Sequence, residues 1–295
     1  MKKLMLIANP FSGQGKAKTS LFPVLDEFCK NDYSPTVYIS GGEKTCRSLA
    51  AQYASQYDLL VCMGGDGTLS DVASGLMEIP EPDRPAVGYI PMGTANDIAS
   101  TLSLSGEPVT AVANIIKKTP SPYDMGKWDG GYFAYIAAFG AFTEVSYSTP
   151  QSLKRAFGHA AYVFSGLSAL PAIKPKHTVV DYEGGTITGD FIFGAVCNST
   201  SVAGLIKLKP DAVDLSDGMF EVILVRNPMT AADFLNIISN VSTQHFDSQD
   251  VMMLHTPWVK FSFDEPVAWT RDGEDGGKHE NVVIENCCKA LNIVF

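Results

Sequence analysis

The stretch Leu59-Leu60-Val61-Cys62-Met63-Gly64-Gly65-Asp66-Gly67-Thr68-Leu69 indicates the fold of this chain more directly than any other. Residues 59–62 form an unbroken apolar run, which is typical of a strand covered on both faces in a parallel sheet. From Leu69 onward, apolar residues recur at helical spacing, at Val72, Ala73 and Leu76. A buried strand is therefore predicted to lead through a glycine-rich loop into a helix, as in an α/β protein.

The same alternation continues on both sides of that stretch. Runs at 4–7, 36–39 and 86–90 predict three more strands, and helical periodicity lies between them. We place the start of the first helix at Ser20, as its N-cap, with Pro23 tolerated in the first turn. Strands and helices that alternate in this way predict right-handed βαβ units around a parallel sheet.

From about Pro120 the pattern changes to strand-like runs separated by Gly, Pro and Asp clusters. These runs are 132–139, 186–197, 219–225, 259–263 and 282–284, and helical stretches interrupt them at 159–170 and 231–241. We therefore predict an α/β domain over residues 1–120 and a mostly antiparallel β-sandwich domain over residues 121–285. The tail, residues 286–295, is left open as a strand of either domain.

Three loops rich in glycine and polar residues follow predicted parallel strands, at 9–16, 64–68 and 91–97. Ligands bind open α/β sheets at the carboxyl ends of the strands. Glycines let backbone amides approach a phosphate, and a helix N-terminus adds N–H groups and a positive dipole end. Asp66 requires a metal, a hydroxyl or a cation to balance its charge. The loops predict a phosphate-binding edge, although neither the Walker pattern nor G-x-G-x-x-G follows a strand here.

Three motifs carry a resemblance to a known family: Asn9-Pro10-x-Ser12-Gly13, Gly64-Gly65-Asp66-Gly67-Thr68 and Pro91-x-Gly93-Thr94-x-Asn96-Asp97. They are followed in order by Lys154-x-x-x-Gly158-x-x-x-Tyr162, Pro210-x-Ala212, Asp217-Gly218 and Asp272-Gly273-Glu274. With these motifs, the chain resembles the diacylglycerol kinase catalytic-domain superfamily, in its bacterial soluble lipid kinase branch. The resemblance spans nearly the whole chain. It implies a first domain similar to NAD kinases and phosphofructokinases, and relatives that include sphingosine and ceramide kinases.

The resemblance also implies roles for individual residues. Asp214, Asp217 and the carbonyl of Met219 would bind a structural Mg²⁺ near the acceptor, in the second domain. The triplet at 272–274 would supply the general base, where we favour Asp272, with Glu274 as the base or its orienting partner. Asp66, Asp97 and Lys154 complete the catalytic set. The residues expected to surround ATP are Asn9, Pro10, Phe11, Ser12, Gly13, Ser40, Gly64, Gly65, Asp66, Gly67, Thr68, Leu69, Ser70 and Thr94.

Two positions depart from the family pattern. Ser40 stands where the family usually has Thr, which keeps the hydroxyl. Gln14 stands where some relatives have a lysine after the glycine, which leaves Lys16 or Lys18 as substitutes.

The residues alone leave other interpretations open. Without the resemblance, the acidic triplet is equally a solvated hairpin tip, and Asp211, Asp214 and Asp217 are equally a solvent-facing turn. The five histidines show no metal or triad context, and Ser12 and Ser40 have no evident histidine base, which disfavours hydrolase chemistry.

Composition sets the remaining bounds. The net charge of −10 disfavours nucleic acid as a partner. The six cysteines are scattered without C-x-x-C, which indicates reduced thiols in a cytosolic protein. The first apolar run is too short for a signal peptide, and no run approaches the ~20 residues of a membrane span. We expect a cytoplasmic protein that contacts the membrane surface transiently, and a homodimer is left open.

The sequence thus predicts an ATP- and Mg²⁺-dependent kinase that phosphorylates the hydroxyl of a lipid alcohol such as diacylglycerol. An NAD kinase-like enzyme is the first alternative, because the Gly64–Thr68 motif is shared with that group. A nucleotide or lipid sensor without catalysis is the second. The identity of the acceptor stays open.

Overall fold

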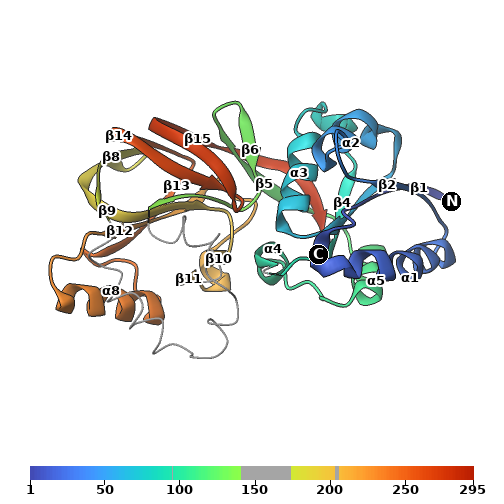
Figure 1. Ribbon diagram of the computed structural model, residues 1–295, viewed down its shortest axis with the longest axis horizontal. Helices are drawn as coiled ribbons and strands as arrows, with labels where there is room; N and C mark the ends of the chain where they lie inside the picture. The colour runs from blue at the N-terminus through green and yellow to red at the C-terminus, as the bar shows by residue number, and fades with distance from the viewer. Residues whose placement is uncertain (95, 141–173, 203–205) are drawn as a thin grey trace.

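The computed structural model describes residues 1–94, 96–140, 174–202 and 206–295, and it has two lobes side by side (Figure 1). The first lobe is built on four parallel strands in the order β4-β3-β1-β2. The strands are β1 (Lys2–Ala8), β2 (Tyr33–Ile39), β3 (Leu59–Gly64) and β4 (Ala86–Pro91). The helices are α1 (Lys16–Lys30), α2 (Cys46–Tyr53), α3 (Asp66–Leu76), α4 (Asp97–Thr101) and α5 (Pro108–Lys117).

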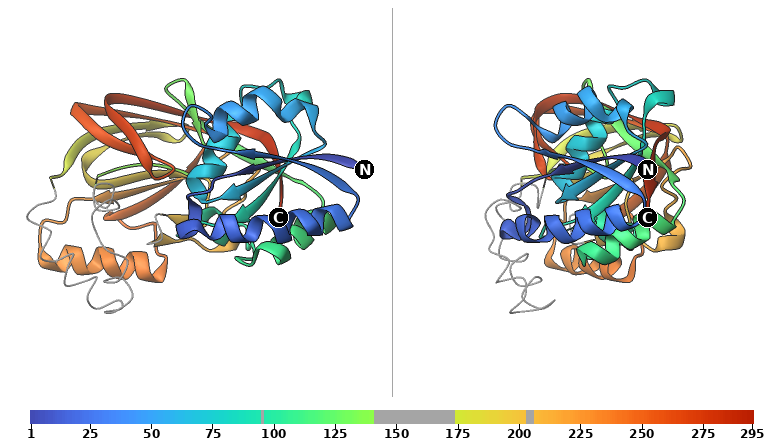
Figure 2. Two further views of the ribbon diagram at one scale, coloured as in Figure 1. Left: turned by 45° about the vertical axis from the view of Figure 1, so that its right-hand side comes forward. Right: turned by 90° about the vertical axis from the view of Figure 1, so that its right-hand side faces the viewer.

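Helices cover both faces of this parallel sheet (Figure 2). Along β1, Leu4 and Leu6 pack in one cluster with α1 and α5, whereas Met5 and Ile7 pack in another with α2 and α3. Because successive side chains of a strand point to opposite faces, an unbroken apolar run is required where both faces are covered. The predicted strands and helices of this lobe are confirmed, but β2, at the edge of the sheet, is only partly buried.

The first helix begins earlier than the sequence suggested. A 3₁₀ turn over Ser12–Gly15 leads directly into α1 at Lys16, with Gly15 in the left-handed region at φ 88°. Ser20 therefore lies inside the helix and does not cap it, and Pro23 lies inside the helix rather than in its first turn. Proline has no backbone N–H, so one hydrogen bond of the helix is missing at Pro23. Because Pro23 is exposed, this gap faces solvent.

The second lobe is mostly antiparallel. Its strands surround a core of aromatic side chains in which Phe139 and Trp269 have ring centroids 4.9 Å apart. A predicted helix is confirmed as α8 (Ala231–Thr243), while the one predicted over 159–170 lies outside the described residues. The strands are β5 (Ser121–Trp128), β6 (Gly131–Phe133), β7 (Ile136–Gly140), β8 (Lys176–Tyr182), β9 (Gly185–Cys197), β10 (Ser201–Val202), β11 (Ile206–Lys207), β12 (Phe220–Arg226), β13 (Val251–Thr256), β14 (Trp258–Arg271) and β15 (Glu274–Val294).

The strand β15 joins the two lobes. It starts antiparallel to β14, continues antiparallel to β5, and ends parallel to β4, where Ile293 and Val294 pair with Val87 and Gly88. As a result, one sheet of 13 strands runs through both lobes. The strand β15 therefore connects the turn at residues 272–273, where it begins, to the sheet of the first lobe, where it ends. Among the described residues, no helix is long and apolar enough to span a bilayer.

Candidate functional site

The three predicted loops meet at the carboxyl ends of β1, β3 and β4. Gly13 has φ +61°, and a side chain there would collide with the carbonyl oxygen of Met92 in the third loop. A Cβ at Gly65 would lie 3.2 Å from the Cα of Gly93. Glycine is thus required at Gly13, and a side chain at Gly65 would crowd Gly93. The loops touch backbone to backbone and form one surface.

The second loop opens α3 without a side-chain cap. The N-cap residue Gly65 makes no capping hydrogen bond, whereas Thr45, Glu107 and Thr230 cap α2, α5 and α8 with their side chains. The first turn of a helix has N–H groups without intrahelical partners and the positive end of the helix dipole. An anion such as a phosphate group suits this position.

The residues predicted to surround ATP differ in whether their side chains face the surface formed by the three loops. Asn9 donates from its amide nitrogen to the Thr68 hydroxyl at 3.2 Å and so joins the first two loops. Ser40 directly follows β2, with its hydroxyl 3.4 Å from the carbonyl oxygen of Ala8. Leu69 packs in the core, so its side chain faces away from the loops. Thr94 is exposed, as is Phe11, whose ring lies under the ammonium group of Lys18.

Asp66 and Asp97 tie these loops together. The Asp66 carboxylate accepts the backbone N–H groups of Asp97, at 2.9 Å, and Ile98, at 3.2 Å, and so caps α4. Burial raises the pKa of Asp66 to about 6, against the lowering effect of these two N–H donors. The buried Asp97 carboxylate accepts from the hydroxyl of Ser201, which belongs to the second lobe, at 2.9 Å. Asp66 therefore holds the third loop, and Asp97 links that loop across to the second lobe.

The Asp272 carboxylate is enclosed by protein donors. Its two oxygens accept the backbone N–H groups of Ala134, at 2.6 Å, and of Tyr135 and Ile136, each at 3.0 Å, together with the hydroxyl of Ser70. The side chain is 4% exposed, and burial raises its pKa although all four donors act in the opposite direction. These bonds fix the turn between β14 and β15 against α3 and the segment before β7.

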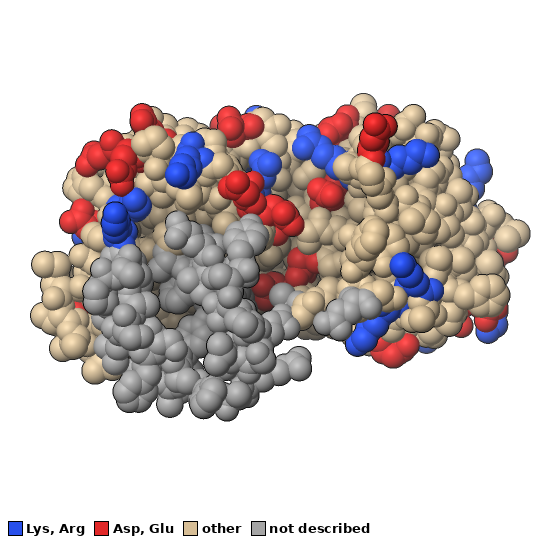
Figure 3. Space-filling view, in the orientation of Figure 1, with Lys and Arg blue, Asp and Glu red and all other residues tan. Residues whose placement is uncertain are grey.

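Glu274 lies at the same turn but is exposed. Its Oε1 atom is 3.5 Å from the point that a Cβ on Gly67 would occupy, which places the carboxylate beside the first turn of α3. No hydrogen bond to this carboxylate is formed within the described ranges. Figure 3 shows acidic side chains gathered between the two lobes on the face drawn. In this arrangement Glu274 is free to accept a proton, whereas Asp272 already holds four donors.

The predicted metal ligands lie on one loop of the second lobe. Asp214 Oδ1 accepts from the backbone N–H and the hydroxyl of Ser216, each at 3.0 Å. Asp217 Oδ1 accepts from the N–H of Met219 at 2.9 Å, and its Oδ2 lies 3.2 Å from Nε2 of His255. The Met219 carbonyl accepts from the amide of Asn286 at 3.1 Å. The part of the chain that the structure describes contains no ready group of three or more His, Cys, Asp and Glu side chains that could hold a metal.

The surroundings of that loop nevertheless suit a hard cation. Glu221 is 2% exposed, its Oε1 atom lies 3.8 Å from Nε2 of His255, and its Oε2 atom has no hydrogen-bond partner among the described residues. Burial raises the pKa of Glu221 to about 8, and the nearby carboxylates of Asp217 and Asp214 act in the same direction. Buried acidic groups of this kind are normally paired or bind a metal. The two carboxylates and the carbonyl of Met219 are oxygen ligands, which Mg²⁺ prefers.

Several residues of the site were not found from the sequence. Asp124 is fully buried, and its carboxylate accepts the N–H groups of Gly218, at 2.7 Å, and Lys289, at 2.6 Å, next to the metal loop. In the sequence, Asp124 could have been noticed as a single carboxylate between apolar residues of a strand. Ser201 and the ring of Tyr135 gave no sequence signal, because only the tertiary fold brings them to the site. Lys154 lies outside the described residues.

Comparison with protein families finds two matches along the chain. Residues 3–128 match the "Diacylglycerol kinase catalytic domain", and residues 138–295 match the "YegS C-terminal NAD kinase beta sandwich-like domain". The first match ends at residue 128 and the second starts at residue 138, within the first strands of the second lobe.

Several named proteins are similar over nearly the full length. The diacylglycerol kinase of Bacillus subtilis (strain 168) is 32% identical over 284 residues, covering 94% of this chain and 91% of that protein. That of Staphylococcus aureus (strain MRSA252) is 34% identical over 280 residues, covering 94% and 87%. A crystal structure of a diacylglycerol kinase from Bacillus anthracis str. Sterne superposes with a TM-score of 0.78, at 20% identity, over 100% of this chain and 97% of that one. At that identity the superposition shows a shared fold.

Proposed function

The chain belongs to the bacterial diacylglycerol kinase family, and from that premise we propose that it transfers the γ-phosphate of ATP to the hydroxyl of a lipid alcohol. Diacylglycerol is the acceptor that the names of its relatives favour. In this proposal, residues 1–120 hold the nucleotide and residues 121–285 hold the acceptor. Because the acceptor hydroxyl lies at a membrane surface, the proposal includes contact with that surface. A homodimer stays a prediction of the sequence.

One observation carries the proposal: between the two lobes, a carboxylate that accepts no hydrogen bond from the described residues lies beside a helix N-terminus without a side-chain cap. The first turn of α3 offers backbone N–H groups to the phosphates of ATP. Glu274, from the second lobe, reaches that same turn next to Gly67. Phosphoryl transfer depends on in-line positioning, neutralisation of phosphate charge and a group that accepts the alcohol proton. The loops supply the first two functions, and Glu274 supplies the third.

The reaction follows from this arrangement. The acceptor oxygen forms a bond to the γ-phosphorus, and the bond from that phosphorus to the bridging oxygen of ADP breaks. The proton of the acceptor hydroxyl moves to the Glu274 carboxylate. Asp272 holds the turn that carries Glu274, through its bonds to residues 134–136 and to Ser70. Asp66 and Asp97 hold the third loop in place against the second.

An assay with two acceptors tests this function. We expect the protein, with ATP and Mg²⁺, to phosphorylate diacylglycerol in mixed detergent micelles and to leave NAD unmodified. The product is measured by mass spectrometry of the lipid extract, with labelled ATP as the donor. A lipid extract in place of pure diacylglycerol identifies another lipid alcohol if that is the acceptor. Phosphorylation of NAD alone would assign the chain to the NAD kinase-like alternative, and nucleotide binding without any turnover would assign it to the sensor alternative.

We propose further that the loop at 214–219 binds Mg²⁺. Asp214, Asp217 and the Met219 carbonyl would hold the ion, which would neutralise this acidic loop of the acceptor lobe. A cation that binds only the folded state stabilises it, by about 2.7 kcal/mol at a concentration 100-fold above Kd. We therefore expect Mg²⁺ without ATP to raise the midpoint of thermal unfolding by a few degrees, as measured by calorimetry.

Two variants locate that effect. Asp217→Asn should abolish the shift, because it removes a charged ligand and leaves the size of the side chain unchanged. Asp211→Asn is the matched control, since Asp211 is an exposed carboxylate just before the same loop and outside the ligand set. A shift of equal size in Asp217→Asn would place the ion elsewhere.

A further inference from the structure

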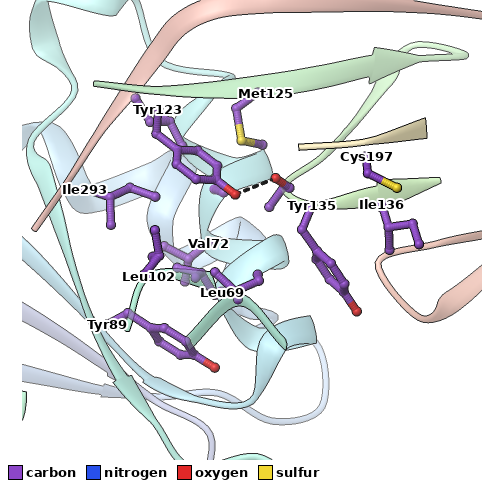
Figure 4. Close-up of a cluster of buried hydrophobic side chains, with 14 of the residues drawn as sticks. Leu69, Val72, Tyr89, Leu102, Tyr123, Met125, Tyr135, Ile136, Cys197 and Ile293 are labelled. Carbon is purple, nitrogen blue, oxygen red and sulfur yellow. Dashed lines mark hydrogen bonds between the residues drawn. The ribbon is translucent and has the colours of Figure 1, made fainter. Parts of the chain in front are cut away.

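The side chain of Tyr135 reaches the turn that carries the proposed base. Its hydroxyl lies 3.7 Å from the point that a Cβ on Gly273 would occupy, between Asp272 and Glu274 in the sequence. Its backbone N–H donates to Asp272 at 3.0 Å, so main chain and side chain both lie at this turn. Figure 4 shows the ring directed away from the segment between β6 and β7 that carries it, with the hydroxyl at its far end.

This hydroxyl differs from those of the neighbouring tyrosines. Tyr123 donates to the carbonyl of Ala134 at 2.8 Å, and Tyr89 lies 3.5 Å from a carboxylate oxygen of Asp66. The hydroxyl of Tyr135 has no hydrogen-bond partner in the described part of the chain, although the residue is only 6% exposed. Its oxygen is not sealed inside the protein, so a ligand can reach it from the space between the lobes. A ligand oxygen there would take the place of water as the partner of this hydroxyl.

The charges around the ring keep the hydroxyl protonated. Burial raises the pKa of Tyr135, and the carboxylates of Asp272, Asp66, Asp97 and Glu274 raise it further. These four carboxylates belong to both lobes and surround the proposed site of transfer. At neutral pH the side chain is therefore a phenol that can donate a hydrogen bond.

We propose that Tyr135 binds the acceptor, by donating a hydrogen bond from its hydroxyl to the oxygen of the lipid alcohol and holding that oxygen against Glu274. The inference rests on the proposed function. The alcohol oxygen has two lone pairs: one accepts from Tyr135 and the other attacks the γ-phosphorus, while the alcohol proton goes to Glu274. Tyr135 keeps its own proton throughout. Acceptors are thus selected for a hydroxyl placed within reach of both residues.

Tyr135→Phe tests this role because it removes only the oxygen. The loss of one neutral hydrogen bond should lower kcat/KM for the lipid acceptor by about three- to tenfold. KM for ATP and the unfolding temperature should stay unchanged, because the hydroxyl bonds neither the nucleotide loops nor other described residues. A deoxy analogue that lacks the acceptor hydroxyl should inhibit wild type and variant with the same constant. Tyr57→Phe, which removes a hydroxyl paired with that of Tyr38, should leave kcat/KM for the lipid, KM for ATP and the inhibition constant of the deoxy analogue at wild-type level.

The outcomes separate this inference from the proposed function. Wild-type kcat/KM for the lipid in Tyr135→Phe would overturn the inference alone. A variant that fails to fold, or loses ATP affinity and lipid turnover together, would also overturn it, by showing a structural role. Tighter binding of the deoxy analogue to wild type than to the variant would contradict a contact with the acceptor oxygen. A wild-type protein inactive on every lipid alcohol would overturn the proposed function, and the inference with it.

Discussion

Replacing Glu274 by glutamine is expected to lower kcat for lipid phosphorylation by ~10²–10⁴-fold, because an amide cannot accept the proton of the alcohol. The side chain is exposed and accepts no hydrogen bond from the described residues, so its replacement should leave the unfolding temperature unchanged. KM for ATP should also stay near the wild-type value, since α3 offers the nucleotide its backbone. Steady-state kinetics with a saturating lipid acceptor and a thermal melt measure all three quantities.

A matched control distinguishes the loss of the proton acceptor from the loss of one negative charge. Glu280→Gln removes one negative charge from an exposed position on the same strand, β15, and should retain wild-type kcat. If Glu274→Gln keeps near-wild-type kcat, Asp272 becomes the next candidate for the base. If Asp272→Asn keeps it as well, the base lies elsewhere, and Asp66 and Asp97 are the next residues to test, although the fold already uses both carboxylates.

The first lobe could be predicted because its information is local. Strands buried on both faces require apolar runs such as 59–62, and each helix repeats its apolar positions along one face. The start of α1 was missed because it depends on the left-handed conformation of Gly15, which the apolar pattern does not record. The continuity of the sheet was also missed. It arises from pairing between β15 and β4, whose partners are far apart in the sequence.

In the site, too, some features could be predicted from local sequence and others could not. Its loops could be located from the sequence, because glycines after buried strands have a direct physical meaning. The tasks of its carboxylates could not, because a carboxylate that caps a helix and one that accepts a proton look alike in a sequence. Asp66 caps α4 and Asp272 holds three backbone N–H groups, facts that depend on segments brought together by folding. The sequence favours Asp272 as the base, with Glu274 as the base or its orienting partner. Because Asp272 is buried among four donors and Glu274 is exposed, we propose Glu274 instead.

Replacing Asp272 by asparagine should lower both stability and kcat. With its remaining oxygen, asparagine can still accept from Tyr135 and Ile136, but its amide group would face the N–H of Ala134, donor against donor. A buried N–H without an acceptor costs about 1–3 kcal/mol, which should lower the unfolding temperature by several degrees. The turn would shift and displace Glu274, and a displacement of about 1 Å in a reacting group costs roughly 10²-fold in rate.

The double variant tests whether Asp272 acts through Glu274. If Asp272 only positions the base, adding Asp272→Asn to Glu274→Gln should reduce kcat little further, because no base is left to position. The loss of unfolding temperature should persist in full, since the unsatisfied N–H of Ala134 does not depend on residue 274. If Asp272 accepted the proton itself, the kcat effect of Asp272→Asn would be equally large in both backgrounds. A double-variant cycle in kcat, with a melt of all four proteins, distinguishes the two because residues that act as one unit give non-additive effects.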